Sequence, residues 1–282
     1  MSRRSGGLGP ALEMMIKIGN FLFRYRNGLF PAVYALLAFK SHPLLENYWL
    51  ALLLGFLVAS AGQLLRAITI GLEYIIRGGR DRQVYAEKLV QGGVFAHCRN
   101  PLYVGNFLIL LGVGLASNSL LFVGIAIPFF LFAYAAIIAA EENYLRTKFG
   151  QEFIDYCARV NRLLPSFSGL RQTVSGMRYN WRRLLTAEYG STYIWLAAMI
   201  LVALKNQWLD KAYHPGDIVE PTLGGAFVFV TVAYGILRFL KKKGLLNVVP
   251  QPALPTASSD QYAGQPLAAG QASPPSSLRA QA

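Results

Sequence analysis

The chain has 282 residues, with 27 Lys and Arg against 14 Asp and Glu, and its formal net charge is +13. Hydrophobic residues make up 54% of the sequence and charged residues 15%, and the mean hydropathy is +0.36. This composition excludes disorder over most of the chain and argues against an ordinary soluble domain. The basic residues lie between long apolar segments and not on a soluble face, so the sequence predicts a polytopic membrane protein that binds no nucleic acid.

The N-terminal residues 1–27 are expected to form a basic segment at the membrane interface. Met1–Pro10 is basic and rich in glycine, and no apolar core of 7–15 residues follows it. A cleavable signal peptide is therefore not expected.

Six apolar segments are expected to cross the bilayer, because a spanning helix needs about 20 mostly apolar residues. They are Gly28–Phe39, Tyr48–Leu65, Leu102–Ala116, Leu120–Ala140, Gly190–Leu204 and Thr222–Leu240. Ala67–Ile76, which contains Glu73, is expected to continue the second span on the cytosolic side. The predicted fold is thus an all-α transmembrane bundle, with a core at residues 28–165 and two further spans at residues 190–244.

The distribution of charge predicts which side of the membrane each loop faces. The three loops expected outside, Lys40–Asn47, Ser117–Ser119 and Lys205–Pro221, hold only three of the 27 Lys and Arg. Because basic residues concentrate on the cytoplasmic side of membrane proteins, both termini are expected in the cytoplasm.

The cytosolic segments differ in character. Arg77–Pro101 is polar and punctuated by glycine, which predicts a loop with one short helix at Gln83–Leu89. Residues 166–189 form a basic linker, and residues 245–282, rich in Pro, Ala, Gln and Ser, are expected to be disordered. Between them, residues 141–160 repeat apolar side chains at helical spacing, which predicts an amphipathic helix that continues the fourth span along the membrane surface. Its apolar face comprises Leu145, Phe149, Phe153, Tyr156 and Val160.

Metal chemistry and hydrolase chemistry find no support in the sequence. The chain has three His and two Cys. His42 and His214 fall in the expected outside loops, and His97 stands beside Cys98, where adjacent side chains diverge. Because a structural zinc site needs four ligands, no metal is expected. A Ser/His/Asp set and a glycine-rich phosphate loop are also missing.

The helix that begins at Pro101 is the first candidate for a binding site. Proline suits the first helical turn, whose free amides together with Arg99 would attract an anionic group such as a carboxylate. Gly105, one turn further, would leave room for a flat ligand to approach the backbone. The alternative is a plain junction between loop and span with Tyr103 at the interface.

The adjacent carboxylates Glu141 and Glu142 are the second candidate. They follow an apolar span directly, so they repel each other and are costly to desolvate, and a cationic partner is expected. The partner could be Arg146 or Lys148 on the same helix, Arg99 from the loop, or a bound cation. The alternative is a solvated helix with an (i, i+4) pair between Glu142 and Arg146.

Taken in order, these pieces resemble the isoprenylcysteine carboxyl methyltransferase and phospholipid methyltransferase superfamily of integral membrane enzymes. The resemblance covers residues 77–165 and comprises Arg99-Asn100-Pro101-Leu102-Tyr103-Val104-Gly105, two spans, Glu141-Glu142, Leu145, Phe149-Gly150-Gln151-Glu152-Phe153, Tyr156 and Arg159-Val160-Asn161-Arg162-Leu163-Leu164-Pro165. Asn100 stands where the family often has His. Residues 135–140 lack the Arg that commonly precedes the Glu pair in the prenylcysteine enzymes.

The resemblance implies S-adenosylmethionine as methyl donor, bound in a pocket that faces the cytosol, and a membrane lipid or lipidated cysteine as acceptor. It implies catalytic roles for Arg99 and Glu142, and it places Arg159 and Arg162 in a closing segment near the acceptor. The residues that it assigns to the cofactor site are His97, Arg99, Asn100, Pro101, Tyr103, Gly105, Glu141 and Glu142.

Several functions stay open at this point. Within the superfamily, the acceptor could be a phospholipid or a lipid phosphate. A membrane reductase that uses NADPH is the rival enzyme, and a non-catalytic lipid-binding protein is the rival without chemistry. The oligomeric state cannot be read from the sequence.

Overall fold

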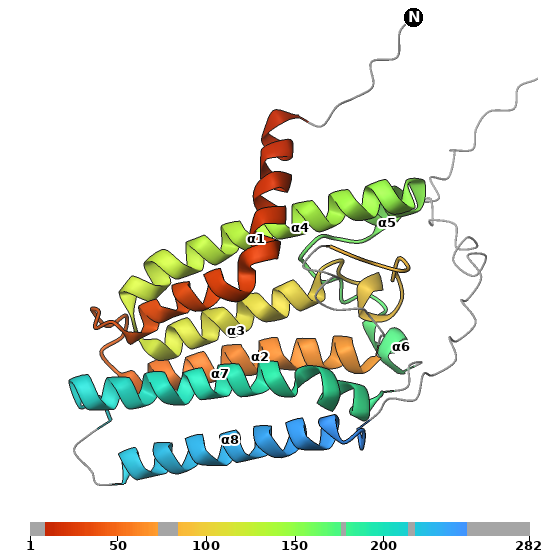
Figure 1. Ribbon diagram of the computed structural model, residues 1–282. Helices are drawn as coiled ribbons and strands as arrows, with labels where there is room; N and C mark the ends of the chain where they lie inside the picture. Colours follow the sequence, from red (N-terminus) through yellow and green to blue (C-terminus); the bar gives the residue numbers. More distant parts are fainter. Residues whose placement is uncertain (1–8, 73–83, 176–178, 214–217, 247–282) are drawn as a thin grey trace, which may run out of the picture. The chain divides into compact units, whose positions relative to one another are not determined.

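The computed structural model describes residues 9–72, 84–175, 179–213 and 218–246, and every regular element in these ranges is helical, as predicted (Figure 1). The α-helices are α1 (Pro10–Tyr34), α2 (Tyr48–Leu72), α3 (Pro101–Ser117), α4 (Ile127–Phe149), α5 (Gln151–Arg159), α6 (Leu170–Ser175), α7 (Trp181–Asp210) and α8 (Val219–Lys242). Two 3₁₀ turns, η1 (Ala35–Ala38) and η2 (Gly93–Ala96), and a π-helical turn, η3 (Phe122–Ala126), complete them. The π-helical turn leads directly into α4.

Within these ranges, four helices are long and apolar enough to cross a membrane, namely α2, η3 together with α4, α7 and α8. The apolar helix α3 has only 17 residues. The prediction of about six spans is therefore slightly higher than the structure supports. The expected first span, residues 28–39, is divided between the end of α1 and η1. Because α1 already begins at Pro10, its first half carries charged residues such as Lys17 and Arg24.

The long helices lie side by side in an order that differs from the chain order. Helix α3 contacts α4 and α2, α2 contacts α7, and α7 contacts α8, while α1 packs against α4 (Figure 1). The main core cluster lies among α2, α3, η3, α4 and α7 and is made of residues such as Leu110, Phe122, Phe130 and Trp195. The two C-terminal helices are thus attached to the predicted core through α7.

Small residues allow α2 and α3 to pack with their backbones in contact. A Cβ atom added at Gly62 would lie 2.6 Å from the carbonyl oxygen of Gly105, and one added at Gly112 would lie 2.5 Å from the amide nitrogen of Ala59. Such close approach at these two positions requires glycine, as at the small-residue interfaces of membrane helices. The contact therefore fixes the position of the start of α3 along the axis of α2.

The amphipathic helix expected at residues 141–160 is broken in the middle. Gly150 has φ +54°, a left-handed conformation that ends α4 and turns the chain into α5. Phe153, Tyr156 and Val160 of the predicted apolar face are buried, and they pack with Leu89 of the preceding loop and with the partly buried Leu145 and Phe149. The protein's own loop thus covers this part of the face, and the position of the helix along the membrane surface stays a prediction.

The loop and linker predictions need correction in part. Residues 84–89 contain no helix, so the short helix expected at Gln83–Leu89 is wrong wherever the structure describes it. The expected linker, residues 166–189, contains α6 and the first turns of α7. The expected boundaries after residues 27 and 189 lie inside α1 and α7. Glu73, His214 and the expected disordered tail from residue 247 onward lie outside the described residues.

Candidate active site

The loop before α3 is tied to the segment that follows α5, so the two ends of the predicted motif meet. The Arg99 amide donates to the Asn161 carbonyl at 2.9 Å, and the Ser166 amide donates to the His97 carbonyl at 2.9 Å. The Asn100 side chain donates to the Arg162 carbonyl at 3.0 Å. These bonds bring residues more than 60 positions apart in the sequence into one layer over the start of α3.

His97 connects the loop before α3 to the segment that contains Ser166 and α6 through hydrogen bonds. Its Nδ1 lies 2.9 Å from the Ser166 carbonyl oxygen and its Nε2 lies 2.9 Å from the Thr173 hydroxyl on α6, and the ring is buried. Both ring nitrogens are therefore engaged by the chain itself. In the described residues no group of three or more His, Cys, Asp or Glu side chains could hold a metal ion.

The start of α3 differs from the expected anion site. Pro101 is the first helical residue, as predicted, but the amides of Tyr103 and Val104 both donate to the Asn100 carbonyl. These amides are engaged, so the strongest positive charge beside the helix start is the Arg99 guanidinium.

Arg99 and Glu142, here called the site pair, lie together beside the C-terminal half of α4. Arg99 Nη1 is 3.2 Å from Glu142 Oε1, and Arg162 Nη2 donates to Glu142 Oε2 at 2.6 Å. Of the partners considered from the sequence, Glu142 has Arg99 and not Arg146, so far as the structure describes the chain. Lys148 donates instead to the Ala86 carbonyl.

The site pair is incomplete. Arg99 Nε and Glu142 Oε1 are buried, and neither makes a hydrogen bond among the described residues, although Oε1 lies 3.2 Å from Arg99 Nη1 in the ion pair. The side chains keep 16% and 17% of their surface exposed. Because a buried polar atom without a hydrogen bond is costly, this donor and this acceptor suggest a place for a ligand that supplies a hydrogen bond to each.

Glu141 points to a different set of partners. The Tyr103 hydroxyl donates to Glu141 Oε1 at 2.7 Å, and the Tyr103 ring packs edge-on against Tyr134 at 5.6 Å. The two neighbouring glutamates thus have different partners: Glu142 contacts Arg99 and Arg162, and Glu141 contacts Tyr103.

Two predicted residues lie elsewhere. Gly105 is buried against α2, where a Cβ atom would lie 2.6 Å from Cγ of Arg66 and 2.9 Å from the Gly62 carbonyl oxygen. Arg159 donates to Gln91 at 3.1 Å on the exposed side of α5. Gly105 therefore serves helix packing, and Arg159 joins α5 to the loop, whereas Arg162 reaches the site pair.

The two cysteines have different surroundings. Cys157 contacts Arg99 Nη1, which no pattern in the sequence indicated. Cys98 is fully buried and its thiol points to the Leu163 carbonyl at 3.4 Å. Burial raises the pKa of the Cys98 thiol, although a backbone hydrogen bond and the charge of Arg99 offset part of this effect. Cys98 therefore remains a neutral thiol near pH 7.

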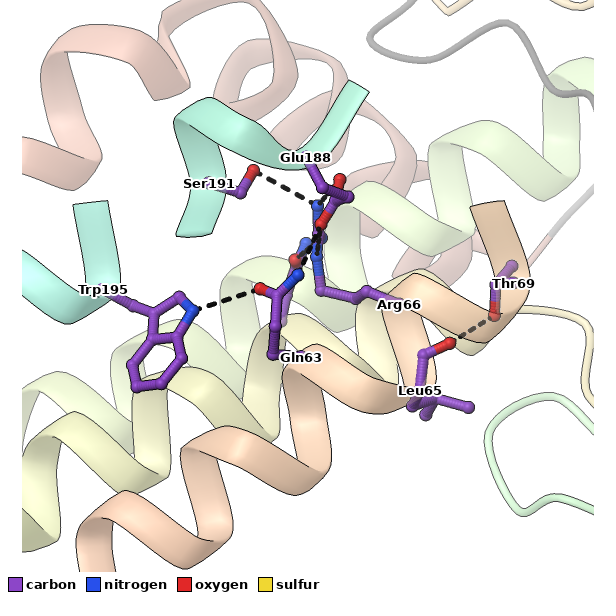
Figure 2. Close-up of polar contacts among 8 residues, drawn as sticks. Gln63, Leu65, Arg66, Thr69, Glu188, Ser191 and Trp195 are labelled. Carbon is purple, nitrogen blue, oxygen red and sulfur yellow. Dashed lines mark hydrogen bonds and ion pairs between the residues drawn. The ribbon is translucent and has the colours of Figure 1, made fainter. Parts of the chain in front are cut away.

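A second ion pair was missed by the sequence analysis. Arg66 of α2 and Glu188 of α7, here called the buried pair, make two hydrogen bonds of 2.8 Å (Figure 2). The signal for it was present, because Arg66 interrupts an otherwise apolar segment and ionisable residues in such segments mark functional positions. Its partner could not be identified, since Glu188 lies 122 residues further along the chain.

The residues at the site suit an amino acid ligand. A guanidinium with a free donor binds a carboxylate, and a carboxylate with a free acceptor binds an ammonium group. S-adenosylmethionine carries both groups at one end, so Arg99 and Glu142 fit the cofactor that the resemblance implies.

Comparison with known proteins shows which protein family the chain resembles. The profile of the phospholipid methyltransferase family matches residues 50–152, which include α2, α3, α4 and the site pair. No solved structure matches the chain.

Three curated relatives illustrate the range of the similarity. The nickel-cobalt-cadmium resistance protein NccN of Alcaligenes xylosoxydans xylosoxydans is 29% identical over 173 residues, or 58% of this chain and 76% of that protein. The cobalt-zinc-cadmium resistance protein CzcN of Cupriavidus metallidurans is 32% identical over 171 residues, or 57% and 71%. A probable protein-S-isoprenylcysteine O-methyltransferase of Oryza sativa subsp. indica is 27% identical over 129 residues, or 44% and 65%.

Proposed function

Because the chain belongs to the superfamily of integral membrane methyltransferases that includes the phospholipid and isoprenylcysteine carboxyl methyltransferases, we propose that it transfers a methyl group from S-adenosylmethionine to a membrane-embedded acceptor. The acceptor is a lipid or a lipidated cysteine, and the phospholipid amine and lipid phosphate are the alternatives within the superfamily. The proposed active site faces the cytosol, with both termini on the same side, as the distribution of Lys and Arg indicates.

The incomplete site pair is the observation that carries this proposal. Arg99 would bind the carboxylate of the cofactor through Nε, and Glu142 would bind the ammonium through Oε1, since neither atom makes a hydrogen bond among the described residues. Arg162 and the loop bonds of Asn100 hold Glu142 and Arg99 in place before any ligand arrives, which lowers the entropy cost of binding. When bound, S-adenosylmethionine supplies a methyl group on a positively charged sulfur.

The protein's own residues have two tasks in the reaction. They align the acceptor with the methyl group and exclude water, because methyl transfer is an in-line displacement. A carboxylate or phosphate acceptor is already ionised and needs no base, whereas an ammonium acceptor must first lose a proton, either to Glu142 or to water. Charge decreases in the transition state when an anionic acceptor reacts with a cationic donor. A site of low dielectric at the membrane edge therefore favours the reaction.

The test uses purified protein and labelled S-adenosylmethionine. Glu142→Gln and Arg99→Ala are expected to weaken binding by about 10- to 100-fold, since each removes a charge-assisted hydrogen bond. Glu152→Gln is the matched control, because Glu152 binds Gln91 on the exposed side of α5 and should leave binding unchanged. Wild-type binding in both site variants would overturn the proposal.

The acceptor is identified in a second experiment. Membranes that contain the protein are incubated with methyl-labelled cofactor, and the labelled products are sorted into lipid and protein fractions. Label in the protein fraction indicates a lipidated cysteine, and label in the lipid fraction indicates a phospholipid or lipid phosphate. Label in neither fraction, with intact cofactor binding, would contradict a lipid acceptor.

A further inference from the structure

We propose that the buried pair positions the start of α3 for methyl transfer, so that α7 belongs to the catalytic unit although it lies outside the family match. This inference rests on the proposed function. Arg66 and Glu188 act as positioning residues, because they reach the candidate active site only through Gly105 and Asn106 of α3.

The buried pair is complete, and it is removed from solvent. The side chains of Arg66 and Glu188 are 4% and 3% exposed. Arg66 Nε and Nη2 each donate to one oxygen of Glu188 at 2.8 Å, and Nη2 also lies 3.3 Å from the Ser191 hydroxyl. Figure 2 shows the two side chains facing each other between α2 and α7.

A second layer of side chains fixes Glu188 in this orientation. Gln63 Nε2 donates to Glu188 Oε2 at 3.3 Å, and Trp195 Nε1 donates to Gln63 Oε1 at 3.1 Å (Figure 2). The first turn of α7 is also joined to the end of α2, because the Asn180 amide donates to the Gly71 carbonyl at 2.8 Å. The contact between α2 and α7 therefore includes hydrogen bonds as well as apolar packing, and hydrogen bonds define the relative orientation of the two helices.

Arg66 passes this constraint to α3. Its Nη1 donates to the Asn106 side chain, and its aliphatic part lies against Gly105. In the same helical turn, the Tyr103 hydroxyl donates to Glu141 of α4. The turn of α3 that carries Tyr103 is thus bonded to α2 through Arg66 and to α4 through Glu141.

The chemistry of the buried pair supports a role beyond stability. Removing two charges from water is expensive, and apolar residues of similar volume often replace a buried ion pair with no loss of stability. We therefore assign to this ion pair a fixed relative position of the helices that apolar packing alone would not provide. A displacement of about 1 Å at reacting groups can lower a rate about 100-fold, so a fixed height of α3 along α2 matters to the reaction.

The decisive variant replaces both partners at once. Arg66→Met together with Glu188→Met keeps side-chain volume in the bundle and leaves no unpaired charge, so the melting temperature is expected to stay within a few degrees of wild type. If the pair positions α3, kcat falls about 10- to 100-fold while KM for the acceptor changes little, since the acceptor's own contacts remain. Amide hydrogen exchange of residues 102–106 is expected to become several-fold faster.

The matched control breaks a similar bond at the opposite end of the same helices. Asn206 of α7 donates to the Ser117 carbonyl of α3 at 3.2 Å. Asn206→Ala is expected to lower the melting temperature slightly and to leave kcat and the exchange of residues 102–106 unchanged. A stable double variant with wild-type kcat and exchange would overturn the inference, because the pair would then serve stability alone.

Two further results keep the test decisive. Should the double variant fail to fold, Asn106→Ala severs the connection between Arg66 and α3 directly, and an unchanged kcat in that variant contradicts the inference. Should the wild-type protein transfer no methyl group, the proposed function fails. Hydrogen exchange of residues 102–106 then still decides whether the buried pair fixes α3.

Discussion

The buried pair and the site pair show how one kind of interaction, between Arg and Glu, serves two purposes. The buried pair, Arg66 and Glu188, satisfies its atoms with two bonds of 2.8 Å and is nearly inaccessible to solvent. The site pair, Arg99 and Glu142, stands at 3.2 Å, is partly exposed, and leaves one donor and one acceptor without a partner among the described residues.

The difference follows from what holds each pair. The buried pair joins two long helices, α2 and α7, that pack against each other. Arg66 and Glu188 therefore satisfy each other's hydrogen bonds without a ligand. The site pair joins α4 to a loop, and each partner has a further contact, Arg99 with Cys157 and Glu142 with Arg162. A ligand can therefore bind at the site pair without breaking a hydrogen bond between its partners, whereas a ligand at the buried pair would first have to break two.

The largest expected effect separates the two pairs by stability. Glu188→Gln leaves the Arg66 charge buried and unpaired, so we expect the free energy of unfolding to fall by about 3–5 kcal/mol. Glu142→Gln is expected to cost about 1 kcal/mol or less, because solvent reaches the site pair and Arg99 keeps other contacts. Chemical unfolding in detergent measures both, and equal losses would refute the distinction between a closed and an open pair.

The second prediction concerns the α2–α3 contact, which lies between the two pairs. Gly62→Ala places a methyl group 2.6 Å from the Gly105 carbonyl oxygen, where only backbone movement can relieve the clash. We expect a loss of about 1–3 kcal/mol in the free energy of unfolding, together with weaker methyl transfer. Gly235→Ala on α8 is the control, because a Cβ atom there meets open space. If both variants are equally stable, the close contact does not constrain α3.

A smaller effect is expected from Tyr103→Phe. The change removes the 2.7 Å hydrogen bond to Glu141 and keeps the ring that packs on Tyr134. Cofactor affinity or kcat should fall about 3- to 10-fold, which corresponds to the usual net contribution of one hydrogen bond, about 0.5–1.5 kcal/mol. Tyr193→Phe on α7 is the comparison, since its hydroxyl lies at a long 3.5 Å from Thr231. Equal activity in the Tyr103 variant would mean that Glu141 needs no fixed orientation.

The smallest effect is a difference in thiol reactivity. Cys157 is half-buried beside Arg99 and should react with a maleimide before the buried Cys98. Because burial raises the pKa of Cys98, its thiolate is scarce at pH 7, and its labelling should keep increasing with pH above the usual range for thiols. Mass spectrometry of labelled peptides measures both rates. Bound S-adenosylmethionine should protect Cys157 several-fold, and labelling unaffected by the cofactor would place the ligand elsewhere.

Much of the fold follows from local patterns. Long apolar segments predicted the membrane-spanning helices, because a segment of that length and composition has few other stable environments. The resemblance to the superfamily placed the motif that begins at Arg99 and the pair Glu141-Glu142 in one candidate site. In the structure, Arg99 and Arg162 both contact Glu142, so these parts of the motif are neighbours.

Other features could not be read from local patterns. The apolar face of residues 145–160 was assigned correctly, but the sequence does not reveal whether lipid or protein covers such a face. Gly105 illustrates the same limit, because a glycine that admits a ligand and a glycine that admits a helix look alike. Here Gly62 and Arg66 occupy the space.

The amino-acid sequence by itself determined the all-helical membrane class, because this class depends on composition and periodicity. The resemblance of its motifs to a known superfamily indicated the superfamily and singled out Arg99 and Glu142 as site candidates. Only the tertiary structure decided that Glu188 meets Arg66 and that α7 supports α3. A buried charge selects its partner by position in space, and residues more than 100 positions apart become neighbours only after the helices have packed.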